Sequence, residues 1–153
     1  MTESKKIATR DAYGKALAEL ANENSKIFVM DADLSQSTKS VEFAKVCPER
    51  FINAGIAEGN MIGVAAGLAS MGKTVFASSF AVFVTGRAFE QIRNSVCYPR
   101  LNVKVAGSHS GITVGEDGGT HQAIADIALM RSLPNMTVLV PADATTTCWM
   151  VRE

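Results

Sequence analysis

A glutamate at the start of a glycine-rich apolar segment is the first residue that could do chemistry. Glu58 has mostly apolar neighbours, and Gly59, Gly63 and Gly67 follow it at intervals of four. A carboxyl group shielded from water can act in general acid–base catalysis. It can equally be an ordinary acidic residue in the first turn of a helix, where the helix dipole favours negative charge. Spacing alone does not choose between these interpretations.

The three glycines lie on one face of a helix predicted over residues 57–70. Each glycine inside a helix costs about 1 kcal/mol relative to alanine, so three cost about 3 kcal/mol. This cost must therefore be offset by a close contact on this face of the helix that larger side chains would prevent. Tight packing within the chain's own domain is the interpretation that spacing favours, and the close approach of another backbone or a flat ligand is the alternative.

Two further segments carry residues that could contact a ring or a polar substrate. Phe80 and Phe83 could stack on a planar ring, or could be core residues that open a helix. The segment 108–122 contains both histidines, His109 and His121, with two acidic residues and four glycines. These histidines could be surface residues or weak metal ligands, but no third ligand stands at standard spacing. The phosphate-loop pattern G-x-x-x-x-G-K-[ST] is absent from the sequence.

Short strands that alternate with helices must position these residues. An amphipathic helix with Thr9 as its N-cap is predicted to precede a strand over 27–30. The elements predicted after it are strand 51–55, helix 57–70, strand 74–78, helix 82–96, strand 101–106, helix 122–131, strand 137–140 and a helix capped by Asp143. This alternation predicts an α/β fold, with an open parallel sheet and helices on both faces. The polar loop 31–37 follows the first strand, at the end where such sheets usually bind ligands.

Composition restricts the fold and the partners further. The 153 residues suffice for one domain, 1–153, whose last helix is expected to be cut by the chain end. Fifteen basic and fifteen acidic side chains cancel and are scattered, which argues against nucleic acid or a membrane surface as partner. The longest mostly apolar stretch, 61–71, is shorter than the ~20 residues that cross a bilayer. Three cysteines without C-x-x-C spacing predict reduced thiols in a soluble, cytoplasmic protein.

The segment around the glutamate resembles a known family. Residues 51–69, F-I-N-A-G-I-A-E-G-N-M-I-G-V-A-A-G-L-A, look like the glutamate helix of the pyrimidine-binding domain in thiamine diphosphate enzymes. Transketolases, deoxyxylulose-phosphate synthases and the beta subunits of 2-oxo-acid dehydrogenases share this domain. The resemblance implies the thiamine diphosphate-binding fold and assigns Glu58 the hydrogen bond to N1′ of the aminopyrimidine, which activates the cofactor. It also assigns Phe80 and Phe83 to the aminopyrimidine.

The loop 108–122 narrows the resemblance to transketolases. It is similar to their signature H-x-S/G-x-x-x-G-E-D-G-x-T-H-Q, whereas deoxyxylulose-phosphate synthases favour G-x-D-G-x-T-H-H. The resemblance implies that His121 is a catalytic residue beside the thiazolium and the substrate carbonyl. It also implies that Asp117 binds a hydroxyl of the acceptor sugar and that His109 contacts sugar hydroxyls or phosphate. The remaining assignments are Arg10 and Ser37 for the substrate phosphate, and Asp33 and Leu34 for the cofactor.

A transketolase transfers a two-carbon ketol unit from a ketose phosphate to an aldose phosphate, a reaction of the pentose phosphate pathway. The G-D-G motif that holds the cofactor's diphosphate through Mg²⁺ or Ca²⁺ is absent, so no metal ligand is assigned to this chain. The resemblance implies a diphosphate-binding subunit or domain as partner, in a homodimer or heterotetramer, and an inactive isolated chain. Two alternatives stay open. One is a thiamine diphosphate enzyme acting on a 2-oxo acid, like deoxyxylulose-phosphate synthase or a dehydrogenase beta subunit. The other is a non-catalytic assembly domain.

Overall fold

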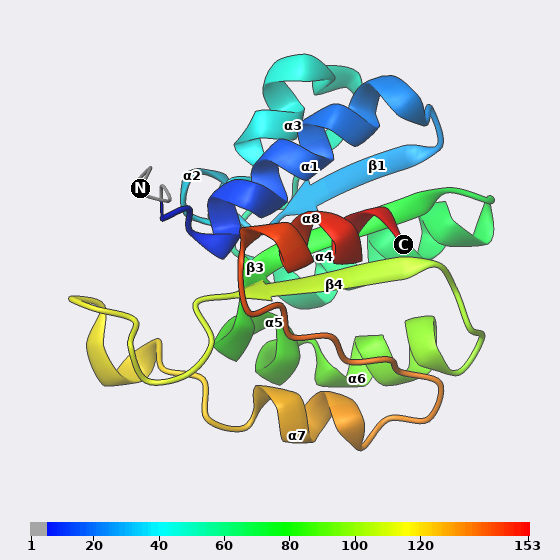
Figure 1. Cartoon of the computed structure of the whole chain (residues 1–153). Helices are drawn as coiled ribbons and strands as arrows, with labels where there is room; N and C mark the ends of the chain where they lie inside the picture. Colours follow the sequence, from blue (N-terminus) through cyan, green and yellow to red (C-terminus); the bar gives the residue numbers. More distant parts are fainter. Residues whose placement is uncertain (1–5) are drawn as a thin grey trace.

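A parallel sheet lies at the centre of the computed structural model, which describes residues 6–153. Its strands are β1 (Ile27–Asp31), β2 (Phe51–Asn53), β3 (Thr74–Phe80) and β4 (Val103–Ser108), in the order β2-β1-β3-β4. All three neighbouring pairs are parallel, as the alternation of strands and helices predicts. The carboxyl ends of the strands therefore share one edge of the sheet, on the left in Figure 1.

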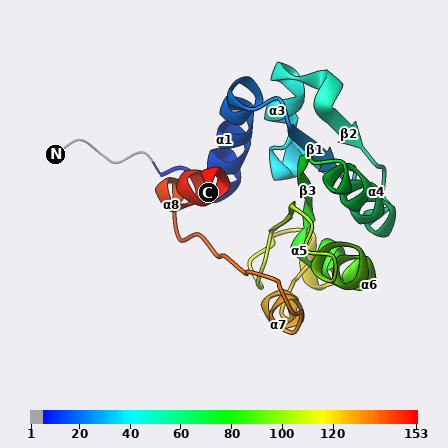
Figure 2. The ribbon, with the colours of Figure 1, turned by 90° about the vertical axis from the view of Figure 1, so that its right-hand side faces the viewer.

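Helices cover both faces of this sheet, as predicted (Figure 2). The first face carries α1 (Thr9–Glu23), with α8 (Ala144–Arg152) beside it, and α3 (Val41–Val46); the second carries α4 (Glu58–Ser70), α5 (Ala81–Arg87), α6 (Phe89–Gln91), the π-helical turn η2 (Ile92–Cys97) and α7 (Asp126–Arg131). Strand side chains alternate between two cores. Val29 and Phe76 pack with α1, whereas Met30 and Ala77 pack with α4.

The strand predicted over 137–140 does not form. Leu139 and Val140 are 57% and 64% exposed, and their segment belongs to no strand. Within residues 6–153, β4 is an edge strand whose sheet neighbour is β3. Apolar residues become a strand only where they form backbone hydrogen bonds with a neighbouring strand, and residues 137–140 form none with the open edge of β4.

Several predicted helices have different bounds. The helix predicted over 122–131 begins at Asp126, because Ala123 forms an antiparallel bridge with Gly111 that holds the preceding residues outside the helix. The helix predicted over 82–96 is divided into α5, α6 and η2. Thr9 is the first residue of α1 and not its N-cap; Ala8 occupies that position without a side-chain cap. The polar loop after β1 contains the short helix α2 (Ser35–Thr38), and the 3-10 turns η1 (Pro48–Arg50) and η3 (Gly118–Thr120) complete the elements.

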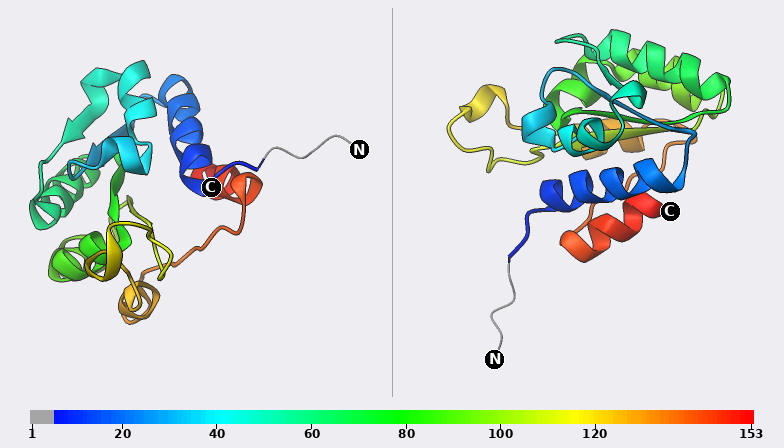
Figure 3. Two further views of the ribbon diagram at one scale, coloured as in Figure 1. Left: turned by 90° about the vertical axis from the view of Figure 1, so that its left-hand side faces the viewer. Right: turned by 90° about the horizontal axis from the view of Figure 1, so that it is seen from above.

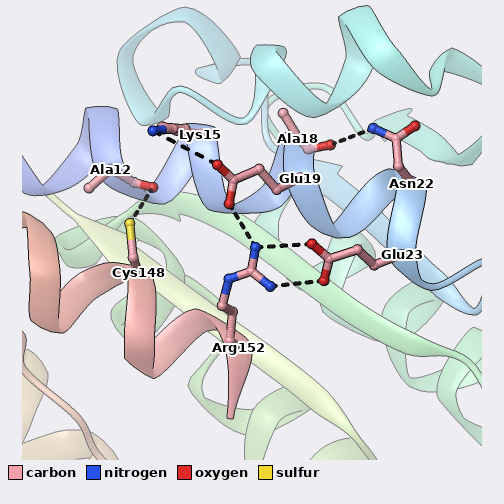
Figure 4. A network of polar contacts seen from close by, with 8 residues as sticks. All are labelled: Ala12, Lys15, Ala18, Glu19, Asn22, Glu23, Cys148 and Arg152. Carbon is pink, nitrogen blue, oxygen red and sulfur yellow. Dashed lines mark hydrogen bonds and ion pairs between the residues drawn. The ribbon is translucent and has the colours of Figure 1, made fainter.

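The last helix lies alongside the first (Figure 3). Asp143 caps α8 as predicted, because its Oδ1 accepts from the Thr146 backbone N–H at 2.7 Å and the Thr146 hydroxyl accepts from the Asp143 N–H at 3.1 Å. At the other end, Arg152 donates to Glu23 at 2.8 Å and to Glu19 at 2.7 Å (Figure 4). Both ends of α8 are thus fixed, the second of them directly to α1.

Within residues 6–153 no helix combines the length and the apolar character that crossing a membrane requires.

Candidate active site

The predicted site residues gather at the carboxyl edge of the sheet. Asp33 and Leu34 follow β1, Glu58 follows β2, Phe80 ends β3 and His109 follows β4. Parallel strands present their carboxyl ends together, and this edge is where open α/β sheets bind ligands. The sheet topology, and not proximity in the chain, therefore brings these residues together.

Glu58 is a buried carboxylate with a half-exposed partner. It is the first residue of α4 and is 3% exposed. Its Oε1 accepts a hydrogen bond from Nη1 of Arg87 at 3.0 Å, and the Arg87 side chain is 51% exposed. The Arg87 Cζ also lies 4.0 Å from the centroid of the Phe83 ring. The guanidinium thus joins the carboxylate to an aromatic face, because a cation is attracted both to the carboxylate's charge and to the negative potential over the neutral ring's face.

Arg87 was not among the residues singled out from the sequence. Phe83 and Arg87 are four residues apart on α5, which is the spacing at which helical side chains meet, so their contact could have been predicted. Nothing in the sequence points from Arg87 to Glu58, which is 29 residues earlier.

Two phenylalanines and two histidines form one aromatic cluster. The rings of Phe80 and Phe83 stack with centroids 5.9 Å apart and an interplanar angle of 13°. The His109 ring lies 4.1 Å from Phe80, and the His121 ring lies 5.1 Å from Phe83. The loop 108–122 therefore folds back over the start of α5. Because Phe80 is buried and Phe83 is partly exposed, Phe83 is the ring better placed to contact a ligand.

Arg10 fixes the protonation of His109. Its Nη1 lies 3.0 Å from His109 Nε2, and arginine can only donate, so Nε2 is the acceptor and Nδ1 carries the ring proton. That Nδ1 lies 2.9 Å from Ser108 Oγ. Burial and the Arg10 guanidinium lower the pKa of His109, against the smaller opposing effect of Asp117. His109 is therefore neutral at pH 7 and Arg10 is the cation of the pair.

We expect Arg10→Met to raise the pKa of His109, because the variant removes a positive charge that disfavours the imidazolium. NMR titration of the two histidine Cε1–H resonances measures this effect, and His121 serves as the internal reference. The matched control is Lys15→Met, which removes one charge from the same helix where it pairs with Glu19. A His109 pKa that is unchanged or lower in Arg10→Met would contradict the assigned pair.

A buried acid supports the loop after β1. Asp31 is fully buried, and its Oδ2 accepts from the hydroxyls of Thr38 at 2.7 Å and Ser40 at 2.8 Å. Its Oδ1 accepts from the Leu34 backbone N–H. Burial raises the pKa of Asp31, and these hydrogen bonds oppose that rise. The network holds the loop in place, with Asp33 at a left-handed φ of 65°.

The remaining predicted residues face solvent more freely. Asp33 accepts a hydrogen bond from Asn53 at 3.1 Å, which links the ends of β1 and β2. Ser37 is partly exposed and Asp117 is exposed. No cluster of three or more His, Cys, Asp or Glu side chains that could hold a metal ion occurs within residues 6–153.

The glycine face of α4 does not pack within this domain at Gly63 and Gly67, so the interpretation that spacing favoured is wrong for these two residues. Gly63 and Gly67 are exposed, and a Cβ on either would meet no atom within 4 Å. Only Gly59 has a near neighbour, Gln91 Oε1 at 3.4 Å from its added Cβ. The chain's own packing does not require glycine at 63 or 67, which leaves the approach of another backbone or a flat ligand as their reason.

Comparison with known proteins decides the family. The family profile described as "Transketolase, pyrimidine binding domain" matches residues 5–153. The chain belongs to this transketolase family. The "Putative transketolase C-terminal section" of Methanocaldococcus jannaschii is 60% identical over 134 residues, which cover 88% of this chain and 42% of that protein.

Solved structures of transketolases have the same fold as this transketolase-family domain. The structure described as "Split gene transketolase, inactive beta4 tetramer" is 63% identical with a TM-score of 0.83, over 97% of this chain and 48% of its own. Transketolase from Leishmania mexicana is 31% identical with a TM-score of 0.87, over 99% of this chain and 24% of its own. The chain therefore spans less than half the length of each of these relatives. The family resemblance and the fold class predicted from the sequence are confirmed, whereas the individual roles of the site residues stay predictions.

Proposed function

We propose that this chain supplies the aminopyrimidine half of a thiamine diphosphate site in a transketolase. The reaction is transfer of a two-carbon ketol unit from a ketose phosphate to an aldose phosphate. Membership of the transketolase family and the transketolase relatives support this function. The observation that carries it is the buried carboxylate of Glu58, which lies at the carboxyl edge of the sheet and is joined through Arg87 to the partly exposed ring of Phe83.

The residues at this edge fit the aminopyrimidine. Glu58 and Phe83 already hold a planar, nitrogen-rich group, the Arg87 guanidinium, which donates to the carboxylate and lies over the ring. An aminopyrimidine could make the same two contacts. It is flat, so it can stack on the Phe83 ring, and it carries ring nitrogens that can share a proton with the Glu58 carboxyl group. The pair is therefore suited to such a ring in both shape and polarity.

The chain's own residues would bind and orient the reactants. When bound, thiamine diphosphate supplies the electron sink that cleavage of a carbon–carbon bond beside a carbonyl requires. Glu58 would hold a proton at N1′ of the aminopyrimidine in a position shielded from water, while Phe83 orients the ring. His121, which lies against Phe83, would hydrogen-bond the carbonyl oxygen of the substrate.

The substrate's phosphate would bind at Arg10 and Ser37. Arg10 is exposed, and its planar fork can donate two charge-assisted hydrogen bonds to phosphate oxygens. Its neutral partner His109 would contact the phosphate or nearby hydroxyls of the sugar. Asp117, which is exposed in the neighbouring loop, would accept from a hydroxyl of the acceptor sugar.

A partner would complete the cofactor site. The open glycine face of α4 suits the approach of a second polypeptide. The relatives extend well beyond the matched region, and one is described as an inactive beta4 tetramer. We infer that a diphosphate-binding subunit or domain holds Mg²⁺ or Ca²⁺ with the diphosphate, in a homodimer or heterotetramer, and that the chain alone is inactive.

A reconstitution assay tests this function. The chain is mixed with its diphosphate-binding partner, recognised by a G-D-G motif, and with thiamine diphosphate, Mg²⁺, xylulose 5-phosphate and ribose 5-phosphate. Formation of sedoheptulose 7-phosphate, with none when either protein is omitted, is the expected result. No product from a folded complex that binds the cofactor would contradict the proposal, and release of carbon dioxide from pyruvate would favour an enzyme of 2-oxo acids instead.

A further inference from the structure

Arg87 makes both contacts that the proposed function assigns to the aminopyrimidine. Its Nη1 donates to Oε1 of Glu58 at 3.0 Å, and its Cζ lies 4.0 Å from the centre of the Phe83 ring. One planar group therefore fills the place between the carboxylate and the aromatic ring. A second planar group cannot take the same oxygen and the same ring face while the guanidinium stays there.

We propose that Arg87 is a latch, which occupies the place of the aminopyrimidine in the cofactor-free chain and swings into solvent when the cofactor binds. This inference rests on the proposed function and adds a residue that determines how readily the cofactor enters. The latch gives the buried carboxylate of Glu58 a cationic partner before the cofactor arrives, and an unpaired buried charge would be costly.

The surroundings of Arg87 leave it free to move. It is the last residue of α5, and its side chain is 51% exposed. Among residues 6–153, Glu58 is the only hydrogen-bonding partner of its guanidinium. The preceding residue, Gly86, is exposed and has no side chain, so it places no atoms beside the solvent-facing half of the Arg87 side chain. The guanidinium gives up two contacts when it leaves and regains hydration.

The latch lowers the apparent affinity for the cofactor. A site that is competent in only a fraction of molecules binds with its intrinsic affinity multiplied by that fraction, so a latch closed in about nine molecules of ten weakens binding about tenfold. A substitution that removes the Arg87 guanidinium should therefore raise the apparent affinity for the cofactor by the same factor. A residue that held the cofactor in place would have the opposite effect when removed, so the direction of the change distinguishes the two roles.

Chemical labelling of the wild-type complex tests the movement without relying on activity. Phenylglyoxal modifies arginine side chains that solvent can reach, and peptide mass spectrometry reports each site. We expect thiamine diphosphate to increase the labelling of Arg87, because the cofactor displaces it into solvent. Arg93, which is 53% exposed and pairs with Glu90 away from the site, is the internal control and should not change. Protection of Arg87 by the cofactor would overturn the latch.

Calorimetry with thiamine diphosphate and Mg²⁺ tests the affinity. Arg87→Gln in the complete complex should bind the cofactor about tenfold more tightly than wild type, and Arg93→Gln should bind like wild type. If the wild-type complex binds the cofactor and depends on Glu58, but Arg87→Gln binds equally or more weakly, the latch is wrong and the proposed function stands. If the wild-type complex does not bind the cofactor, the latch and the proposed function both fail.

Discussion

Glu58→Gln is expected to lower the turnover of the assembled transketolase by a factor of about 10² to 10⁴, the usual contribution of a positioned proton-transfer group. Glutamine has the same size and can still hydrogen-bond a ring nitrogen, but it cannot hold an exchangeable carboxyl proton there. The measurement is sedoheptulose 7-phosphate formation at saturating thiamine diphosphate, so that weaker cofactor binding does not enter the comparison.

The matched control is Glu90→Gln, which makes the same change at an exposed acid of α6 that pairs with Arg93. This variant should keep wild-type turnover. Near-normal turnover of Glu58→Gln, in a complex with wild-type melting behaviour, would remove Glu58 from the mechanism and with it the main support for the proposed function.

Gly14→Ala should lower the free energy of unfolding by about 1–3 kcal/mol, the usual cost of overpacking a tight contact. Alanine normally stabilises a helix relative to glycine by about 1 kcal/mol, so the expected sign is reversed. The reason is that a Cβ on Gly14 would overlap the carbonyl oxygen of Lys39 and lie 2.7 Å from its Cβ. Lys39 itself has a φ of 68°, which restricts the ways it can yield. Urea denaturation with linear extrapolation measures the difference.

Gly67→Ala is the matched substitution in an open position. No atom lies within 4 Å of the added Cβ, so the variant should stabilise the isolated chain by up to about 1 kcal/mol. The same methyl group should weaken assembly with the diphosphate-binding partner if α4 is the contact face. Destabilisation by both alanines, or by neither, would contradict the packing described for α1 and α4.

The main features of the fold were predictable because they depend on local patterns. Short apolar runs such as 74–78, alternating with longer helical segments, indicate a parallel sheet covered on both faces, and this is the observed architecture. The pattern failed at 137–140, where the residues are equally apolar. Hydrophobicity reports a tendency to be buried, whereas a strand also needs its backbone groups to pair with those of a neighbouring strand. The segment's own sequence does not show whether the preceding chain brings it into register with the open edge of β4.

The candidate site was predictable in position and not in its internal contacts. A parallel sheet brings the carboxyl ends of its strands together, so residues that follow those ends, such as Glu58 and His109, are expected at one edge. The ion pair of Glu58 with Arg87 depends on how closely α4 approaches α5, and the buried bonds of Asp31 depend on the path of the following loop. Neither distance follows from residue spacing.

The backbone at Asp33 and His109 has a consequence for engineering this domain. Their φ angles of 65° and 55° lie in the left-handed region, which costs a residue with a side chain about 1–2 kcal/mol and glycine almost nothing. Glycine would remove this backbone cost at either position, but it would also remove the hydrogen bond between Asp33 and Asn53 or the packing of His109 on Phe80. Both positions are also predicted ligand contacts, so a glycine chosen for its relaxed backbone alone is expected to lower activity.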